Sequence, residues 1–356
     1  MEKKKVLVGM SGGVDSSAAA ALLLEEGYDV YGATMRLLPC ESDEYDTTAE
    51  EDAKKVCSAL GIKHYIFDFR EEFKKNVIEY FVNEYLNGRT PNPCIACNKH
   101  LKFGLMLDKA LEMGMDYIAT GHYAKIEEKD GIYILKVSDM KEKDQSYVLY
   151  NLTQKQLSHL LLPLAKYTKA QIREKCREWG LSIAEKSESM DICFVKDGNY
   201  QQYIMDYKKI VPSAGDILDT KQNVIGQHKG LINYTIGQRK GIGAYGKPMF
   251  VLKLDIKNNA LILGEAGMEY SKAFTVLDVN FISGEKPIGE MKTNAKVRYK
   301  SEPAPCTLIT NEENTVVLFD TPQRAITPGQ SVVFYNNDEV IGGGVVGEIL
   351  DDFERI

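Results

Sequence analysis

The sequence lacks any hydrophobic run long enough to cross a membrane, since none approaches the ~20 residues that a span requires. The apolar stretch near the N-terminus, Val6–Met10, is also too short to be the core of a signal peptide. Internal repeats and low-complexity tracts are absent as well. With 44% hydrophobic and 27% charged residues, the composition is that of a globular chain. These features predict a protein of the cytoplasm with no membrane partner.

Cysteine is present in an odd number, seven, which argues against the disulfide framework of a secreted protein. Cys57 and Cys176 lie beside apolar residues in helical patterns and are predicted to be core residues. Cys94 and Cys97 form a C-x-x-C pair in a segment with two prolines. Such a pair fits a zinc half-site, a redox pair or an iron–sulfur half-site. No second C-x-x-C exists to complete a zinc site.

An excess of basic residues is also missing, because the net charge is −7. Seven carboxylates between Glu41 and Asp52 are expected to form a solvated loop. Two stretches nevertheless contain basic residues and no acid, namely 220–254 and 291–301. Tyrosines interleave with both stretches, and single-stranded bases stack on such rings. Together the two stretches favour an RNA partner over a merely solvated basic face.

Strand-like and helix-like segments alternate over the first 205 residues. This alternation predicts an α/β domain whose parallel sheet carries helices on both faces. Glycine becomes frequent after about residue 211, and short β runs dominate from about residue 273, which is typical of a small barrel or sandwich. We therefore expect three domains, with bounds of 1–205, 206–272 and 273–356.

A glycine- and serine-rich loop, Gly9–Ser17, separates the first predicted strand from the first predicted helix. Its glycines let backbone N–H groups approach an anion, and the helix N-terminus adds its dipole. The loop has no lysine after the glycines, so it is not a Walker-type loop, and it does not match G-x-G-x-x-G. A turn that binds nothing is the alternative, but the full Ser-Gly-Gly-x-Asp-Ser string argues against it.

That string resembles the PP-loop of the ATP pyrophosphatases. The resemblance implies that the loop holds the β,γ-pyrophosphate of ATP while AMP is transferred to a substrate oxygen. ATP and Mg²⁺ are therefore the expected cofactors, because magnesium bridges phosphates. Asp15 is suited to binding Mg²⁺ or to orienting the loop.

Over nearly its whole length the chain resembles the tRNA-specific 2-thiouridylase family. The resemblance is carried by SGGVDSS, TPNPCIACNKHLKF, ATGHYA, KDQSYVLY, SMDICFV, GQHKGLINYTIGQRKG and TPGQSVVFY. It implies a PP-loop α/β domain, a small central α+β domain and a C-terminal β-barrel. The implied reaction is a sulfurtransferase reaction, in which ATP activates the C2 carbonyl of the wobble uridine of tRNA and sulfur replaces the oxygen.

The resemblance also assigns the catalytic cysteines. Cys193 would carry sulfur as a persulfide, and Cys97 would attack to release it, leaving a Cys97–Cys193 disulfide. The sequence departs from the family at Cys94, where an aspartate is usual. Cys94 is therefore either a tolerated replacement or, with Cys97 and Cys193, a ligand of a [4Fe-4S] cluster whose open iron binds sulfide.

Two sets of binding residues follow from the resemblance. The ATP-binding set is Gly9, Met10, Ser11, Gly12, Gly13, Val14, Asp15, Ser16, Met35 and Gly121. The tRNA-binding set is Asn92, Pro93, Cys94, His122, Lys143, Asp144, Gln145, Arg298, Tyr299 and Gln330. Asn92, Pro93 and Cys94 would lie beside the target base, which must flip out to reach them.

The expected partners are a tRNA with a wobble uridine, of the Lys, Glu or Gln type, and a sulfur donor that is a cysteine desulfurase or a sulfur-relay protein. Two other classes of function stay open from the sequence. One is an ATP-pyrophosphatase ligase or amidotransferase that acts on a small molecule, which leaves the basic stretches unexplained. The other is an RNA-binding protein with a degenerate nucleotide site, against which the intact loop argues.

Overall fold

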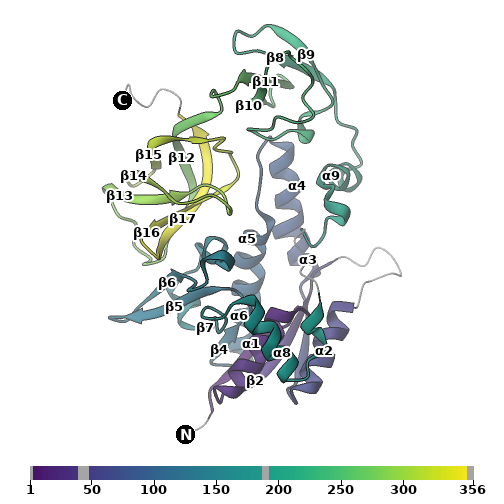
Figure 1. Cartoon of the computed structure of the whole chain (residues 1–356), viewed down its shortest axis with the longest axis vertical. Coiled ribbons are helices and arrows are strands. Elements are labelled where there is room, and N and C mark those ends of the chain that lie inside the picture. The colour runs from purple at the N-terminus through teal and green to yellow at the C-terminus, as the bar shows by residue number, and fades with distance from the viewer. Residues whose placement is uncertain (1–2, 39–47, 187–191, 351–356) are drawn as a thin grey trace.

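The structure, a computed structural model, describes residues 3–38, 48–186 and 192–350. It confirms the expected order of an α/β domain, a small middle domain and a C-terminal β-barrel. In Figure 1 the α/β domain lies at the bottom, the middle domain at the top and the barrel at the left. Most of the acidic stretch 41–52 lies outside the described residues, and from Thr48 onward it is helix α2.

The first sheet is parallel, with strand order β3-β2-β1-β4-β7. Its strands are β1 (Lys5–Gly9), β2 (Asp29–Arg36), β3 (His64–Asp68), β4 (Tyr117–Ala119) and β7 (Leu160–Leu161). Successive side chains of a strand point to opposite faces. Val6 and Val8 accordingly join one buried cluster, which also holds the alanines of α1, while Leu7 joins a second cluster with Met106 of α6. Helices therefore cover both faces, as the alternating pattern predicts.

The helices of this domain agree with the sequence pattern except around the C-x-x-C pair. They are α1 (Val14–Glu25), α2 (Thr48–Ala59), α3 (Arg70–Phe73), η1 (Lys74–Ile78), α4 (Glu79–Leu86), α5 (Pro93–Cys97), η2 (Asn98–Leu105), α6 (Met106–Glu112), α7 (Gln154–Ser158), α8 (Lys169–Glu178) and α9 (Tyr200–Lys208). Short 3₁₀ turns are η3 (Lys141–Lys143), η4 (Ser146–Leu149), η5 (Ser182–Glu185), η6 (Lys196–Gly198) and η7 (Leu231–Asn233).

The sequence pattern predicts a loop over residues 87–98, and this is wrong for its second half. Helix α5 begins at Pro93, because proline is tolerated in the first helical turn, where its missing N–H needs no partner. The side chain of Asn92 caps the helix by accepting from the N–H groups of Cys94 and Ile95. The C-x-x-C pair therefore lies on a helix rather than in a loop.

The middle domain and the barrel are built from β-strands. The middle sheet has the order β10-β11-β8-β9, from β8 (Gly215–Leu218), β9 (Val224–His228), β10 (Met249–Asp255) and β11 (Ala260–Glu265). The barrel closes through the pairing of β12 with β17 and uses β12 (Tyr270–Phe281), β13 (Gly289–Lys296), β14 (Ala304–Thr310), β15 (Thr315–Arg324), β16 (Ser331–Asn336) and β17 (Glu339–Ile349).

A hairpin from the first part of the chain extends the barrel sheet, which the sequence analysis did not anticipate. Strands β5 (Ala124–Lys129) and β6 (Ile132–Val137) pair with each other, and β6 pairs with β17. The hairpin follows directly after the end of β4, so it ties the barrel to the edge of the α/β domain that carries the predicted nucleotide site (Figure 1).

A barrel loop also contacts the segment that leads into α5. The side chain of Gln330 donates to the carbonyl oxygen of Thr90 (3.0 Å), and the N–H of Thr90 donates to the carbonyl of Pro328 (2.8 Å). The barrel thus fixes the chain two residues before the cap of α5. Among the described helices, none combines the length and apolar character needed to cross a membrane.

Candidate active site

The phosphate loop lies between the carboxyl end of β1 and the first turn of α1. Gly12 has a φ of +68°, which favours glycine, and a Cβ there would lie 2.3 Å from the carbonyl oxygen of Ala49. The N–H groups of Gly12 and Gly13 donate to none of the residues that the structure describes. The first N–H groups of α1 lack intrahelical acceptors as well. The loop therefore presents several free donors at a helix N-terminus, as an anion site requires.

Hydroxyl groups brace this loop from within. The Ser16 hydroxyl accepts from the N–H of Ser11 (3.2 Å) and shares a hydrogen bond with the Ser11 hydroxyl (3.1 Å). The Ser17 hydroxyl donates to the carbonyl of Gly13 (2.8 Å). Met10 and Val14 point their side chains into the core, where each is less than 5% exposed, so only their backbones face the loop.

Asp15 is held by two side chains from distant parts of the chain. The ammonium of Lys169 on α8 (2.7 Å) and the hydroxyl of Tyr123 (2.8 Å) both donate to its Oδ1 atom. Of the two predicted uses of Asp15, this geometry supports orienting the loop. Gly121 also lies against the loop, because a Cβ there would lie 2.7 Å from Asp15 and 2.8 Å from the nitrogen of Ser16.

Gly9 and Met35 complete the predicted nucleotide set. Gly9 ends β1, and Met35 lies in the adjacent strand β2, where its partly buried side chain packs against two core clusters. The predicted ATP-binding residues therefore gather at the carboxyl ends of neighbouring parallel strands, which is where open α/β sheets bind ligands.

Cys94, Cys97 and Cys193 come from two segments, α5 and the stretch around Phe194, which both pack against α4. Cys97 is buried in a cluster with Phe194 and Val195, and the ring of Phe194 packs edge-on against those of Phe73 (5.7 Å) and Phe81 (5.2 Å). Cys193 directly precedes Phe194, so this packing brings it to the helix that carries Cys97. The side chains of Cys94 and Cys193 are exposed, whereas that of Cys97 is buried.

The thiols interact electrostatically with one another and with a lysine. Burial raises the pKa of Cys97, Lys102 lowers it and Cys94 raises it further. Although Cys193 is solvent-exposed, desolvation by the surrounding protein raises the pKa of its thiol to about 12, and Cys97 and Cys94 add to the rise. Lys102 opposes this rise too. The thiols of Cys97 and Cys193 are consequently protonated at neutral pH.

A metal centre needs its ligands to converge. Within residues 3–38, 48–186 and 192–350, no group of three or more His, Cys, Asp or Glu side chains is arranged to hold a metal ion. A [4Fe-4S] cluster would bind each of Cys94, Cys97 and Cys193 to a different iron, so these thiols need not converge on one ion, and the cluster stays a prediction. The first three residues of the SMDICFV string, which precede Cys193, lie outside the described residues.

His122 lies beside the cysteine helix. Its Nδ1 atom shares a hydrogen bond with the Thr120 hydroxyl (2.8 Å), and its ring packs against Phe103 (centroids 5.6 Å apart). Burial lowers the pKa of His122 well below its usual value, and the nearby Lys102 lowers it further. His122 is thus a neutral ring at physiological pH.

The 143–145 segment joins the nucleotide site to the barrel. Asp144 accepts hydrogen bonds from Ser138 and Ser146, and burial raises its pKa against their effect. The side chain of Gln145 accepts from the N–H of Tyr123 (3.0 Å). These contacts hold the segment in place, and Lys143, partly buried, lies at its start, in η3.

The barrel residues predicted to bind tRNA lie against this segment. The hydroxyl of Tyr299 donates to the carbonyl of Asp144 (3.0 Å), and its ring, 40% exposed, meets the ammonium of Lys296. Arg298 donates to the carbonyl of Ala325. Tyr299, Asp144 and Gln145 are therefore brought together, and Gln330 contacts the segment before α5.

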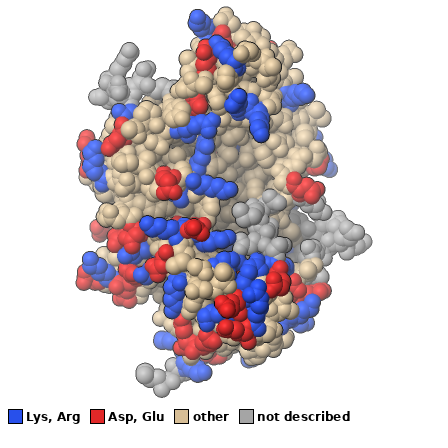
Figure 2. All heavy atoms as spheres, viewed as in Figure 1, with Lys and Arg blue, Asp and Glu red and all other residues tan. Residues whose placement is uncertain are grey.

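In the folded chain, two lysines of the acid-free stretches 220–254 and 291–301 form ion pairs with carboxylates from other segments. Lys247 pairs with Glu265 (2.5 Å), and Lys292 pairs with Asp320 (3.7 Å). Lys229, Arg239 and Lys240 form no ion pair with any described residue. Figure 2 shows a hollow between the barrel and the other domains, with Lys and Arg atoms gathered along its edges.

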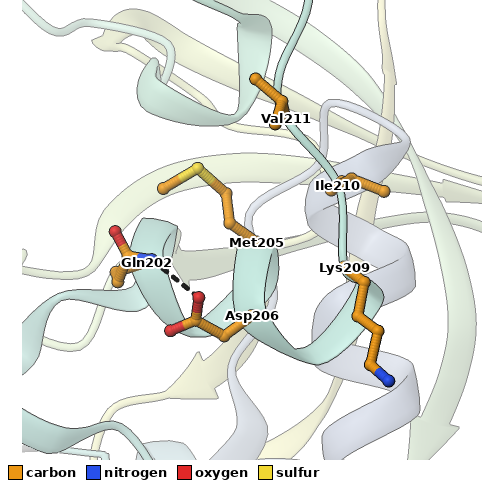
Figure 3. A pocket seen from close by; sticks show the side chains of 6 residues that line it. All are labelled: Gln202, Met205, Asp206, Lys209, Ile210 and Val211. Carbon is orange, nitrogen blue, oxygen red and sulfur yellow. Dashed lines mark hydrogen bonds between the residues drawn. The ribbon is translucent and has the colours of Figure 1, made fainter.

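A separate cavity lies at the end of α9. It has a volume of about 440 Å³ and is lined by Gln202, Met205, Asp206, Lys209, Ile210 and Val211 (Figure 3). The amide of Gln202 donates to Asp206 (2.8 Å) across one side of it. None of the residues predicted for ATP, tRNA or sulfur chemistry lines this cavity.

Three lysines of the site were missed by the sequence analysis. Lys102 lies near Cys97, Cys193 and His122, whereas Lys169 and Lys186 contact the phosphate loop. Lys102 follows Cys97 by five residues, but its place near Cys97 depends on the π-helical segment η2, which has no sequence signal. Lys169 and Lys186 carry no sequence signal, since they lie more than 150 residues from their partners.

Comparison with known proteins finds relatives that match this chain over nearly their whole length. Family models match residues 4–197 (tRNA methyl transferase HUP domain), 202–265 (tRNA methyl transferase PRC-barrel domain) and 271–346 (aminomethyltransferase beta-barrel domain). The tRNA-specific 2-thiouridylase MnmA of Acetivibrio thermocellus is 52% identical over 97% of this chain and 100% of its own length. The chain belongs to the tRNA-specific 2-thiouridylase family.

A second 2-thiouridylase, MnmA of Clostridioides difficile, is 49% identical over 98% of this chain and 99% of its own length. Among solved structures, a 4-thiouridine synthetase in complex with RNA and ATP is similar at 16% identity and a TM-score of 0.35, covering 57% of this chain and 50% of that one. Membership of the 2-thiouridylase family rests on the full-length sequence relatives.

Proposed function

We propose that this protein is an ATP-dependent tRNA sulfurtransferase that converts the wobble uridine of tRNA to 2-thiouridine. One observation carries the proposal: a PP-loop with free N–H donors and the pair Cys97 and Cys193 belong to one domain, in a chain about half identical to 2-thiouridylases. The loop supplies activation by ATP, and the cysteines supply sulfur.

In the first step, the O2 atom of uracil attacks the α-phosphate of ATP, and pyrophosphate leaves. The free N–H groups of the loop and the dipole of α1 stabilise the charge that develops on the departing pyrophosphate. Mg²⁺, when bound with the ATP, would neutralise part of the charge on the phosphates. Lys169 and Tyr123 keep Asp15 in place, so that the start of α1 does not shift when the phosphates bind.

In the second step, the outer sulfur of a Cys193 persulfide attacks C2, and AMP leaves with the oxygen. The Cys97 thiolate then attacks the inner sulfur of Cys193, which releases the 2-thiouridine and forms a Cys97–Cys193 disulfide. An external dithiol must reduce this disulfide before the next turnover. Lys102, near both thiols, stabilises the negative charge on the attacking sulfur.

We propose that the sulfur that loads Cys193 comes from a persulfide on a cysteine desulfurase or a sulfur-relay protein. Cys193 is exposed, which allows such a donor to reach it. For the tRNA, we propose the hollow lined by basic side chains, with the wobble uridine flipped toward Asn92, Pro93 and Cys94 (Figure 2).

The cluster mechanism is the alternative route to the same product. Iron and acid-labile sulfide, measured on anaerobically purified protein, decide between the routes. The persulfide route predicts no stoichiometric iron and an active Cys94→Asp variant, because Cys94 then has no chemical role. About four irons per chain, lost in Cys94→Asp together with activity, would establish the cluster.

The function itself is tested by AMP release. With ATP and magnesium, we expect AMP in amounts that depend on added tRNA and that match the 2-thiouridine formed once sulfur and reductant are supplied. AMP formed with a small substrate and no tRNA would identify a ligase or amidotransferase. No AMP under any condition, with tRNA still bound, would identify a binding protein.

A further inference from the structure

The phosphate loop depends on a Gly-Gly peptide whose orientation the glycines alone cannot fix. Flipping the peptide between two residues turns its N–H to the opposite side, and glycine tolerates both forms. The N–H groups of Gly12 and Gly13 have no partner among the described residues, so nothing on the donor side selects the form that binds an anion. The selection must come from the carbonyl side.

A lysine from a distant segment occupies that carbonyl side. The ammonium of Lys186, which follows η5, donates to the carbonyl oxygen of Gly12 (3.0 Å) and to Oδ2 of Asp52 on α2 (2.8 Å). Its hydrogen bond holds the pKa of Asp52 below its usual value, so the partner is a carboxylate at neutral pH. Asp52 thus anchors the ammonium beside the loop.

The geometry of the peptide bond turns this contact into an effect on ATP. A trans peptide is planar, and its C=O and N–H groups point in opposite directions. A cation on the Gly12 carbonyl therefore directs the N–H of Gly13 away from Lys186, toward the open side of the loop. It also polarises the peptide, which strengthens that N–H as a donor.

We propose that Lys186 is a positioning residue for ATP: its ammonium fixes the Gly12–Gly13 peptide with the N–H toward the β- and γ-phosphates. This rests on the proposed function, in which the loop holds the pyrophosphate of ATP. Lys186 supplies from outside the motif the positive charge that a Walker-type loop carries within it. It differs from Lys169, which holds the side chain of Asp15 and touches no loop carbonyl among the hydrogen bonds of the described residues.

The test compares the affinities of variants for ATP and for AMP, measured by calorimetry with magnesium. Lys186→Met should bind ATP about tenfold more weakly, the loss expected from one charge-assisted hydrogen bond. Its affinity for AMP should not change, because AMP lacks the two phosphates that the loop holds. Lys186→Arg should restore most of the affinity for ATP, and Asp52→Asn should give an intermediate loss.

Lys55→Met is the matched control. Lys55 lies on α2, the helix that carries Asp52, and it also pairs with Asp52 (3.7 Å), but it does not contact the phosphate loop. It should bind ATP like the wild type. The inference is overturned if Lys186→Met keeps the wild-type affinity for ATP, loses affinity for ATP and AMP equally, or matches Lys55→Met. A wild-type protein that binds ATP but releases no AMP with tRNA would instead contradict the proposed function.

Discussion

At the scale of single residues, the environment of Cys193 sets when its sulfur reacts. The thiol is exposed, yet the surrounding protein and two neighbouring thiols raise its pKa to about 12 from an ordinary value of 9.0. The raised pKa keeps the thiol mostly protonated at all pH values below about 12, and the thiolate fraction grows throughout that range. A free Cys193 is therefore protected from side reactions until a donor or substrate changes its surroundings.

This protection predicts how alkylation depends on pH. The rate of Cys193 modification by iodoacetamide should rise about tenfold per pH unit from pH 7 to 10, because each unit multiplies the thiolate fraction about tenfold below the pKa. Peptide mass spectrometry measures the rate at Cys193 separately from Cys94. An unfolded peptide with the same local sequence is the control, and its rate should level off near pH 9. Levelling off below pH 9 in the folded protein would contradict the raised pKa.

Residue identities were predictable where a short string carries the chemistry, and not where a partner lies far away. The loop from Gly9 to Ser17 and the cysteines stand out in the sequence. Lys169 and Lys186 do not, because a lone lysine between helices is ordinary in any sequence. Their roles appear only when folding brings α8 and the segment after η5 against the loop.

At the scale of elements, helix α5 decides where the C-x-x-C pair lies. The run 87–98 contains two prolines, which favours a loop, but one of them occupies the first helical position and the other precedes the cap. The pair Asn92-Pro93 is itself a helix-start signal, and here it outweighs the loop preference of the two prolines. The continuation into the π-helical segment η2 has no sequence signal. It depends on tertiary packing, in which Phe103 of η2 contacts the ring of His122 and η2 contacts η4.

Asn92 could act by capping α5 or by contacting the substrate, and two substitutions distinguish these roles. Asn92→Ala should lower stability by about 1 kcal/mol and reduce thiolation, because the start of the cysteine helix loses its cap. Asn92→Asp should retain most of both, since a carboxylate caps equally well. Thermal unfolding and quantification of 2-thiouridine measure the two effects.

Thr153→Ala, which removes the cap of α7, is the matched control for the stability loss. Its stability should fall to a similar extent, and the folded fraction of this variant should form 2-thiouridine at the wild-type rate. If Asn92→Asp is as inactive as Asn92→Ala while remaining folded, then the amide of Asn92 acts on the substrate and its capping role is secondary.

At the scale of the whole molecule, the α/β domain, the middle domain and the barrel are arranged as Figure 1 shows, and Figure 2 shows a hollow between the barrel and the rest of the chain. The order of domain types was predictable from the change from alternating helices and strands to short β runs. The docking was not, because the β5–β6 hairpin joins the barrel through pairing with β17, and strand pairing across 200 residues leaves no local pattern.

If tRNA binds in the hollow, as we propose, its affinity should depend on basic side chains of the middle domain that form no ion pair with a described residue. The double variant Arg239→Gln, Lys240→Gln should bind tRNA more weakly, and its log Kd should depend less steeply on log salt, by up to about 2 in slope. ATP affinity should not change. Filter binding over a salt series measures both effects.

A second double variant, Lys109→Gln with Lys155→Gln, carries the same change of net charge. Its lysines pair with Glu112 and Asp108 in the α/β domain, so it should bind tRNA like the wild type. Equal weakening in both double variants would show that net charge, rather than this surface, governs binding.

The central claim, that Cys193 delivers sulfur and Cys97 releases it, is tested most directly by a single turnover without reductant. Protein loaded with persulfide is mixed with ATP, magnesium and tRNA, and the peptides are analysed by mass spectrometry under non-reducing conditions. The account predicts a Cys97–Cys193 disulfide in an amount equal to the 2-thiouridine and the AMP formed. Formation of 2-thiouridine and AMP with both cysteines left as free thiols would contradict it.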